Sequence, residues 1–189
     1  MLGDFLVVRN SALMREFGFA AAQASHQFGV DGDRFNSPDN AALAWGLTFW
    51  AEANRTGEFA SNIYRATRGR YFVEAGVSGT ANVPFVTDGI RNRVTPAPID
   101  LNWEFELAAT IHTHPMALRA NNFSQPDLRD AHFVSYLISR DRDGPVKIPA
   151  YIVTNTQVRS TEAVRHPNPT RHRQFATYNE RTVFSGLRH

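Results

Sequence analysis

The spacing of apolar residues changes near Gly57, and this change limits the chain to a fold that contains both helices and strands. Before this point apolar residues recur every three or four positions, which predicts helices over residues 11–28 and 37–53. In the second helix Ser37 is the expected N-cap and Pro38 the expected first helical residue. After Gly57 the apolar residues alternate with polar ones, which is typical of strands. We therefore expect a sheet that follows the first helices in the sequence.

The rest of the chain combines the two patterns. Strands are expected at residues 58–65, 71–77, 83–86, 103–114, 145–154 and 157–164. A further amphipathic helix is expected at residues 125–139. From His166 onward the chain is polar and rich in arginine, and we expect a partly ordered tail. These patterns divide the chain into an N-terminal helical extension (residues 1–35), a globular domain (36–165) and a polar tail (166–189).

Composition excludes several classes of protein. The 189 residues are 42% hydrophobic and include 14 Phe, which is enough for one core and incompatible with intrinsic disorder. No apolar run approaches 18 residues, so no membrane-spanning helix is expected. The absence of Cys excludes disulfides, thiolate metal sites and a cysteine nucleophile, which leaves His, Asp and Glu as metal ligands. The first residues carry Asp4 and no basic region, so we expect no Sec signal and a cytoplasmic location in the producing cell.

The basic side chains are almost all arginine. Arginine supplies 19 of the 20 basic residues, and Lys147 is the only lysine. Pairs of arginines occur at residues 68 and 70, 91 and 93, and 171 and 173, and such pairs can bind nucleic acid. Acidic residues are interspersed among them and no aromatic-basic motif accompanies them, so we interpret them as solvated surface. A nucleic-acid partner is therefore not expected, although an arginine-rich nucleic-acid-binding or nuclease toxin is an alternative function.

One segment carries a pattern typical of a metal site: His112-Thr113-His114-Pro115. Side chains two apart on a strand share a face, with Cα atoms roughly 6 to 7 Å apart, so His112 and His114 can reach one ion before Pro115 ends the strand. Asp127 lies at the start of the following helix, where the helix dipole favours a carboxylate. Two histidines and one carboxylate leave a tetrahedral position open, which is typical of catalytic zinc.

Each part of this pattern also has a purely structural interpretation. A His-x-His pair on a strand can be incidental, and Ser124-x-x-Asp127 with Pro126 is also a helix-capping pattern. Asp130, one helical turn later, is an alternative ligand. The combination, in this order and at this spacing, favours a metal site.

These residues resemble the JAMM, or MPN-type, zinc metalloprotease motif. That motif has an upstream Glu, then His-Ser/Thr-His-Pro, a loop, and Ser-x-x-Asp, which here correspond to His112 to Pro115, Ser124 and Asp127. Nine residues separate His114 from Ser124 where the family usually has seven, which we interpret as a two-residue insertion. The pattern is similar to the JAMM-like domains of bacterial polymorphic and Rhs-type toxins. The resemblance implies an α+β fold related to cytidine deaminases, with a mixed, mostly antiparallel sheet flanked by helices over residues 36–165.

The upstream Glu has to be chosen from Glu52, Glu58, Glu74, Glu104 and Glu106. Glu104 and Glu106 lie roughly 20 Å or more from His112 along the same strand, because a strand rises ~3.3 Å per residue. Glu52 falls within the predicted helix. Glu58 opens the first strand, which is where the resemblance places the general base, and Glu74 is the alternative.

The resemblance implies a zinc-dependent hydrolase of peptide or isopeptide bonds. His112, His114 and Asp127 would hold the zinc, Glu58 would be the general base, and Ser124 would donate a hydrogen bond to the oxyanion. Its expected partners are a protein or peptide substrate, including a ubiquitin-like conjugate, and a cognate immunity protein if the domain is an effector secreted into a target cell. A non-catalytic MPN-like interaction module is an alternative, and its signature would be a missing ligand.

Overall fold

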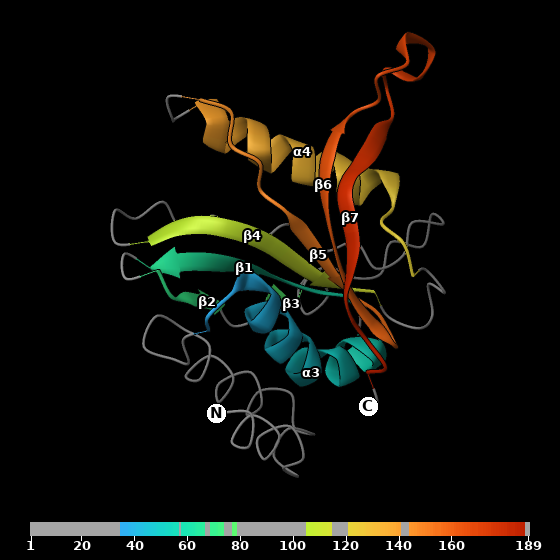
Figure 1. Ribbon diagram of the computed structural model, residues 1–189. Coiled ribbons are helices and arrows are strands. Elements are labelled where there is room, and N and C mark those ends of the chain that lie inside the picture. Colours follow the sequence, from blue (N-terminus) through green and yellow to red (C-terminus); the bar gives the residue numbers. More distant parts are fainter. Residues whose placement is uncertain are drawn as a thin grey trace.

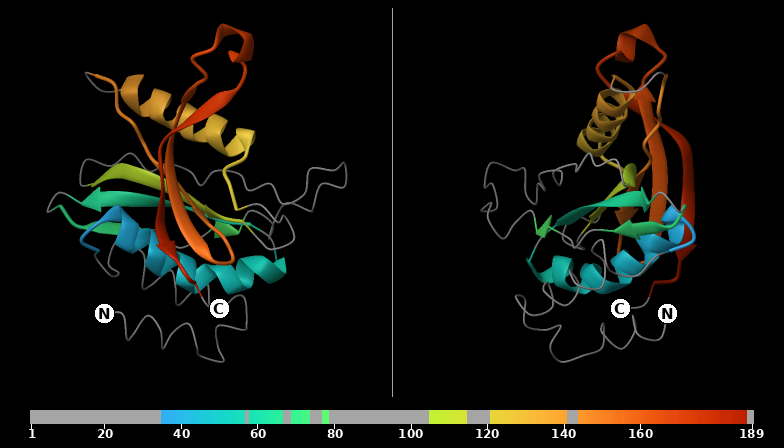
Figure 2. Two further views of the ribbon diagram at one scale, coloured as in Figure 1. Left: turned by 45° about the vertical axis from the view of Figure 1, so that its right-hand side comes forward. Right: turned by 90° about the vertical axis from the view of Figure 1, so that its left-hand side faces the viewer.

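The computed structural model has an α+β architecture in which one sheet lies between two helices (Figure 1). It describes residues 35–56, 58–66, 69–73, 77–78, 105–114, 121–140 and 144–187. Figures 1 and 2 show helix α3 and helix α4 on opposite sides of the sheet. The predicted mixed, mostly antiparallel sheet flanked by helices is confirmed. The helix predicted at residues 11–28 and the strand at 83–86 lie outside the described residues.

The sheet has seven strands, in the order β2-β1-β4-β5-β6-β7 with β3 paired to β1. Their bounds are Phe59–Ala66 (β1), Tyr71–Val73 (β2), Val77–Ser78 (β3), Phe105–Thr113 (β4), Ala150–Val153 (β5), Gln157–Arg165 (β6) and Phe175–Ser185 (β7). Every described pairing is antiparallel except that of β4 with β5, which is parallel. Strand β4 is therefore a central strand, paired with β1 on one side and with β5 on the other.

Helix α3 (Pro38–Thr56) begins as the sequence predicts and covers one face of the sheet. The side chain of Ser37 accepts a hydrogen bond from the backbone N–H of Asn40 at 3.1 Å, which is the expected N-cap contact. Trp45 is fully buried in the core between this helix and the sheet. The helix approaches β5 closely at Gly46, where a Cβ atom would lie 2.9 Å from both γ carbons of Val153.

Helix α4 (Gln125–Arg140) covers the other face, over the range predicted from the amphipathic pattern. Its buried side chains are Leu128, Ala131, Val134 and Ile138. No helix in the part of the chain that the structure describes is long and apolar enough to cross a bilayer.

The C-terminal segment is more ordered than the sequence predicts. In place of a partly ordered tail, Phe175–Ser185 forms β7, which pairs with β6 along its length, and a short 3-10 turn lies between the two strands. The end of this β6–β7 hairpin projects beyond α4 (Figures 1 and 2). The prediction failed because β7 is an edge strand with mostly exposed polar side chains, so it lacks the apolar alternation of a half-buried strand. Backbone pairing with β6 keeps it in the sheet.

Candidate metal centre

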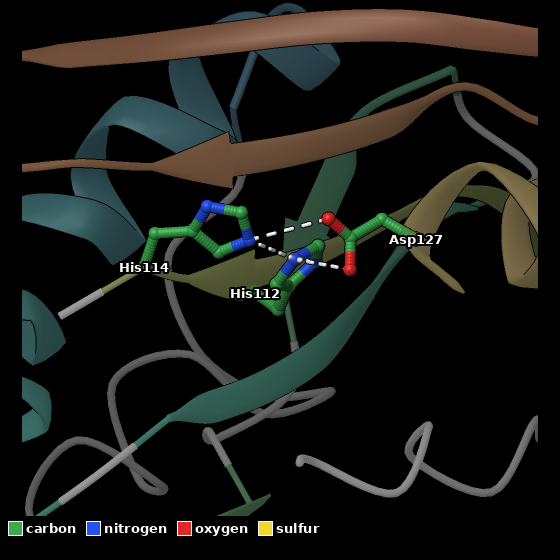
Figure 3. Close-up of side chains that lie close together, drawn as sticks. All are labelled: His112, His114 and Asp127. Atoms are coloured by element: carbon green, nitrogen blue, oxygen red, sulfur yellow. Dashed lines mark hydrogen bonds and ion pairs between the residues drawn. The ribbon is translucent and has the colours of Figure 1, made fainter. Parts of the chain in front are cut away.

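His112 on β4 and His114, directly after the last residue of that strand, lie on the face of the sheet that α4 covers. The two residues that alternate with them, Ile111 and Thr113, are buried on the opposite face. The Nε2 atoms of the two histidines lie 2.9 Å apart, and Figure 3 shows both rings turned toward the same point. Their side chains are only 13% and 4% exposed. The strand thus brings the pair together as the His-x-His spacing predicts.

Asp127 completes the cluster from the first turn of α4 (Figure 3). Its Oδ1 lies 3.4 Å from Nε2 of His112, and its Oδ2 lies 3.3 Å from Nε2 of His114. The same carboxylate accepts a hydrogen bond from the backbone N–H of Ser124 at 2.6 Å, and the N–H of Asp127 donates to Oγ of Ser124 at 3.3 Å. The capping interpretation of Ser-x-x-Asp is therefore correct, and the cap itself aims the carboxylate at the histidines.

The spacing of these three groups fits one small metal ion. Ligand atoms at about 2.0 to 2.1 Å from a tetrahedral zinc are separated from one another by about 3.3 Å. The two Nε2 atoms lie 2.9 Å apart, and each lies 3.3 or 3.4 Å from one of the two oxygens of Asp127, distances that are near this value. Within the residues that the structure describes, His112, His114 and Asp127 form the one group of three or more potential ligands, with one ligand atom from each all within 4.8 Å. The donor set, two imidazoles and a carboxylate, is one that zinc accepts in catalytic sites.

The charges within the cluster reinforce one another. Burial lowers the pKa of His112, but the carboxylates of Asp127, Glu58 and Asp130 together outweigh burial, and the net pKa is raised. Burial raises the pKa of Asp127, but the two histidines outweigh burial and hold this pKa far below its usual range. The carboxylate is therefore ionised at any physiological pH, which is the form that binds a metal.

Glu58 lies beside the histidine pair. In the antiparallel register of β1 and β4, Ala60 is opposite His112, so the same register continued by two residues brings Glu58 opposite His114 and onto the same face. Its side chain is buried, with the residue 8% exposed, and its negative charge contributes to the raised pKa of His112. The N–H of Phe59 donates to the Thr113 hydroxyl at 2.9 Å, which fixes the backbone next to Glu58.

The other carboxylates considered from the sequence do not join the cluster within the described residues. Glu106 pairs with Arg65 at 3.6 Å near the other end of β4, as its distance along the strand predicts. Asp130 pairs with Arg129 at 3.2 Å and is not part of the ligand group. Glu74 and Glu104 lie outside the described residues, as does the side chain of Glu52.

Two polar residues near the cluster have no signal in the sequence motif. Arg159 on β6 donates to the backbone carbonyl of Asn121 at 2.7 Å and to the side chains of Asn122 and Glu180. Gln125 makes two hydrogen bonds to the backbone of Phe175. The one indication in the sequence is a charged residue inside an alternating strand pattern at Arg159.

Comparison of the chain with protein-family models, with curated proteins and with solved structures finds no match.

Proposed function

We propose that this protein is a zinc-dependent hydrolase of peptide or isopeptide bonds, of the JAMM type. The observation that carries the proposal is the grouping of His112, His114 and Asp127, in which one potential ligand atom from each residue lies within 4.8 Å of the other two. Three protein ligands leave a fourth position for water or substrate, which distinguishes a catalytic zinc site from a structural one. Zinc bound there would act as a Lewis acid and bring the pKa of water to about 7.

Glu58 is the proposed general base. A general base must be close to the proton that it takes, and the β1–β4 register, continued two residues beyond Ala60 and His112, brings Glu58 opposite His114 on the same face of the sheet. Its burial removes bulk water from around the carboxylate, which favours proton transfer to and from the substrate. In the proposed reaction Glu58 accepts a proton from the attacking water and passes it to the leaving amine.

Ser124 is the proposed donor to the oxyanion. Its Oγ accepts the N–H of Asp127 at 3.3 Å, so the proton of its own hydroxyl remains available for donation. The residue is exposed at the start of α4, next to Asp127, where a substrate carbonyl can approach. One such donor typically contributes on the order of 10²-fold or more to the rate.

The experiment that tests this function is Glu58→Gln, with Glu106→Gln as the matched control. Wild-type protein loaded with zinc is assayed on a peptide library, on ubiquitin isopeptide conjugates and on peptidoglycan fragments. We expect Glu58→Gln to retain zinc and to lose about 10²- to 10⁴-fold in hydrolysis, because a general base is removed and no ligand is. Glu106→Gln, which changes a carboxylate that pairs with Arg65 near the other end of β4, should be fully active.

Full hydrolysis by Glu58→Gln would contradict the assignment and would move the base to Glu74. If the wild type binds zinc but hydrolyses none of the three substrate classes, the proposed hydrolase activity is contradicted. That result would favour the non-catalytic MPN-like module.

A further inference from the structure

Helix α4 must be held in a defined position for Asp127 to meet the two histidines. Leu128 and Ala131 pack in an apolar cluster with Ala163 of β6 and Phe175 of β7. Apolar contacts are non-directional. They keep the helix on the sheet, but they do not by themselves fix where the carboxylate at its first turn points. Directional contacts at the start of the helix are needed for that.

Gln125 supplies one such contact, two residues before Asp127. Its Nε2 donates to the carbonyl of Phe175 at 2.9 Å, and its Oε1 accepts the N–H of Phe175 at 2.8 Å. The side-chain amide thus pairs with the first residue of β7 through one donor and one acceptor. Two hydrogen bonds to one residue fix orientation as well as distance.

Arg159 supplies a second contact, from near the start of β6. One guanidinium nitrogen donates both to the carbonyl of Asn121, at 2.7 Å, and to the side chain of Asn122, just before α4. The other terminal nitrogen donates to Glu180 of β7. Because the guanidinium is planar and rigid, these partners are held in a fixed geometry.

The position of Arg159 in the sheet connects it to the metal ligands. His112 is opposite Ile152 of β5, and Ile152 is opposite Arg159 of β6, so the three residues form one row on one face. At ~4.8 Å per strand, the backbone of Arg159 lies about 10 Å from that of His112. The arginine therefore ties the segment that leads into Asp127 to the same row of the sheet that carries the first histidine.

We propose that Arg159 and Gln125 are positioning residues for the metal centre, and that the C-terminal hairpin is thus part of the support of the site. The inference rests on the proposed zinc binding by His112, His114 and Asp127. In this account the two side chains act through the start of α4, and neither contacts the metal or the substrate.

The test is the zinc affinity of Arg159→Gln, measured by titration against a chromophoric chelator. We expect affinity to fall about 10- to 100-fold, the typical loss when a residue that orients a metal ligand is removed. Arg159→Lys should recover part of this loss, because an ammonium can still donate to the Asn121 carbonyl. The matched control is Arg171→Gln, an exposed arginine at the hairpin tip with no acidic partner among the described residues, which should bind zinc as the wild type does.

A second measurement separates this inference from zinc binding itself. Hydrogen exchange of the Asp127 and Leu128 amides is followed in metal-free protein, where we expect faster exchange in Arg159→Gln than in Arg171→Gln. A wild type that binds no zinc would overturn the proposed function, and the exchange rates would still decide whether Arg159 orders the start of α4. Unchanged exchange together with unchanged zinc affinity would overturn the inference.

If Arg159→Gln does not fold, Gln125→Ala decides the question, because Gln125 is exposed and its truncation leaves the core intact. We expect it to show the same two effects at smaller size. Wild-type affinity and wild-type exchange in that variant would overturn the inference.

Discussion

The two halves of the candidate metal centre are held in different ways. His112 lies on β4 and His114 follows directly after its last residue; β4 is a central strand that is paired on both sides, and Ile111 and Thr113 are buried on its opposite face. Asp127 lies in the first turn of a helix, where a cap with Ser124 and polar contacts to the hairpin set its direction. The strand half therefore depends on the stability of the whole core. The helix half depends on a few polar contacts and can be disturbed while the rest stays folded.

Ile111→Ala should have the largest effect on stability, because it creates a cavity directly behind the strand half. Ile111 is 1% exposed, and such truncations typically cost about 2 to 5 kcal/mol in the free energy of unfolding. The matched control is Phe133→Ala on the exposed side of α4, where a change within about 0.5 kcal/mol is expected. Urea denaturation measures both. Equal losses in the two variants would contradict the dependence of the strand half on the core.

Asp127→Asn should disturb the helix half alone. The amide oxygen of Asn can still accept the N–H of Ser124, but the contacts of the charged carboxylate with the two histidines are lost, so we expect a loss of about 1.5 to 3 kcal/mol in unfolding free energy. Zinc affinity should fall more than about tenfold, because a charged ligand is replaced by a neutral one, an effect at least as large as losing an orienting residue. Chelator competition and urea denaturation on the same sample measure the two effects. A loss of stability as large as that of Ile111→Ala would contradict the separation between the halves.

Asp39→Asn should have the smallest effect and leave the metal centre unchanged. Asp39, at the start of α3, accepts two hydrogen bonds from Arg181 of β7 and one from Tyr151 of β5, away from the histidines. Burial raises the pKa of Asp39, but these partners outweigh it and the net pKa lies below the ordinary value of 3.8.

The sign of the pH dependence follows from that shift. A carboxyl with a lowered folded pKa stabilises the protein above its unfolded pKa, and this contribution is lost as the pH falls through the folded value. The free energy of unfolding of the wild type should thus be about 1 kcal/mol higher than that of Asp39→Asn at neutral pH. This difference should disappear under strongly acidic conditions. Thermal melts from neutral to acidic pH measure it. An altered zinc affinity in this variant would show that polar contacts far from the site also control it.

The same division explains what could be predicted from the sequence. The helix at Pro38–Thr56, the helix at Gln125–Arg140 and the strand that carries the histidines follow from apolar spacing, capping residues and turn residues, which are local signals. The grouping of His112, His114 and Asp127 was also predictable, because a short motif fixes two of the residues on one strand and the third at a helix start.

The support of Asp127 could not be predicted in this way. Gln125 contacts a backbone 50 residues away, and Arg159 contacts Asn121 at a separation of 38. No local pattern encodes such pairs, and β7, which provides half of them, has the polar exposed sequence of a tail. Polar contacts of long sequence separation depend on the packed fold, so they become visible only in the structure.

The most direct test of the account is the zinc content of the purified protein. Protein incubated with zinc and then dialysed is measured by inductively coupled plasma mass spectrometry, alongside a His112→Ala/His114→Ala variant whose fold is checked by circular dichroism. We expect about one zinc per chain in the wild type and none in the variant. Folded wild type without zinc, or a variant that retains one equivalent, would contradict zinc binding by the two histidines.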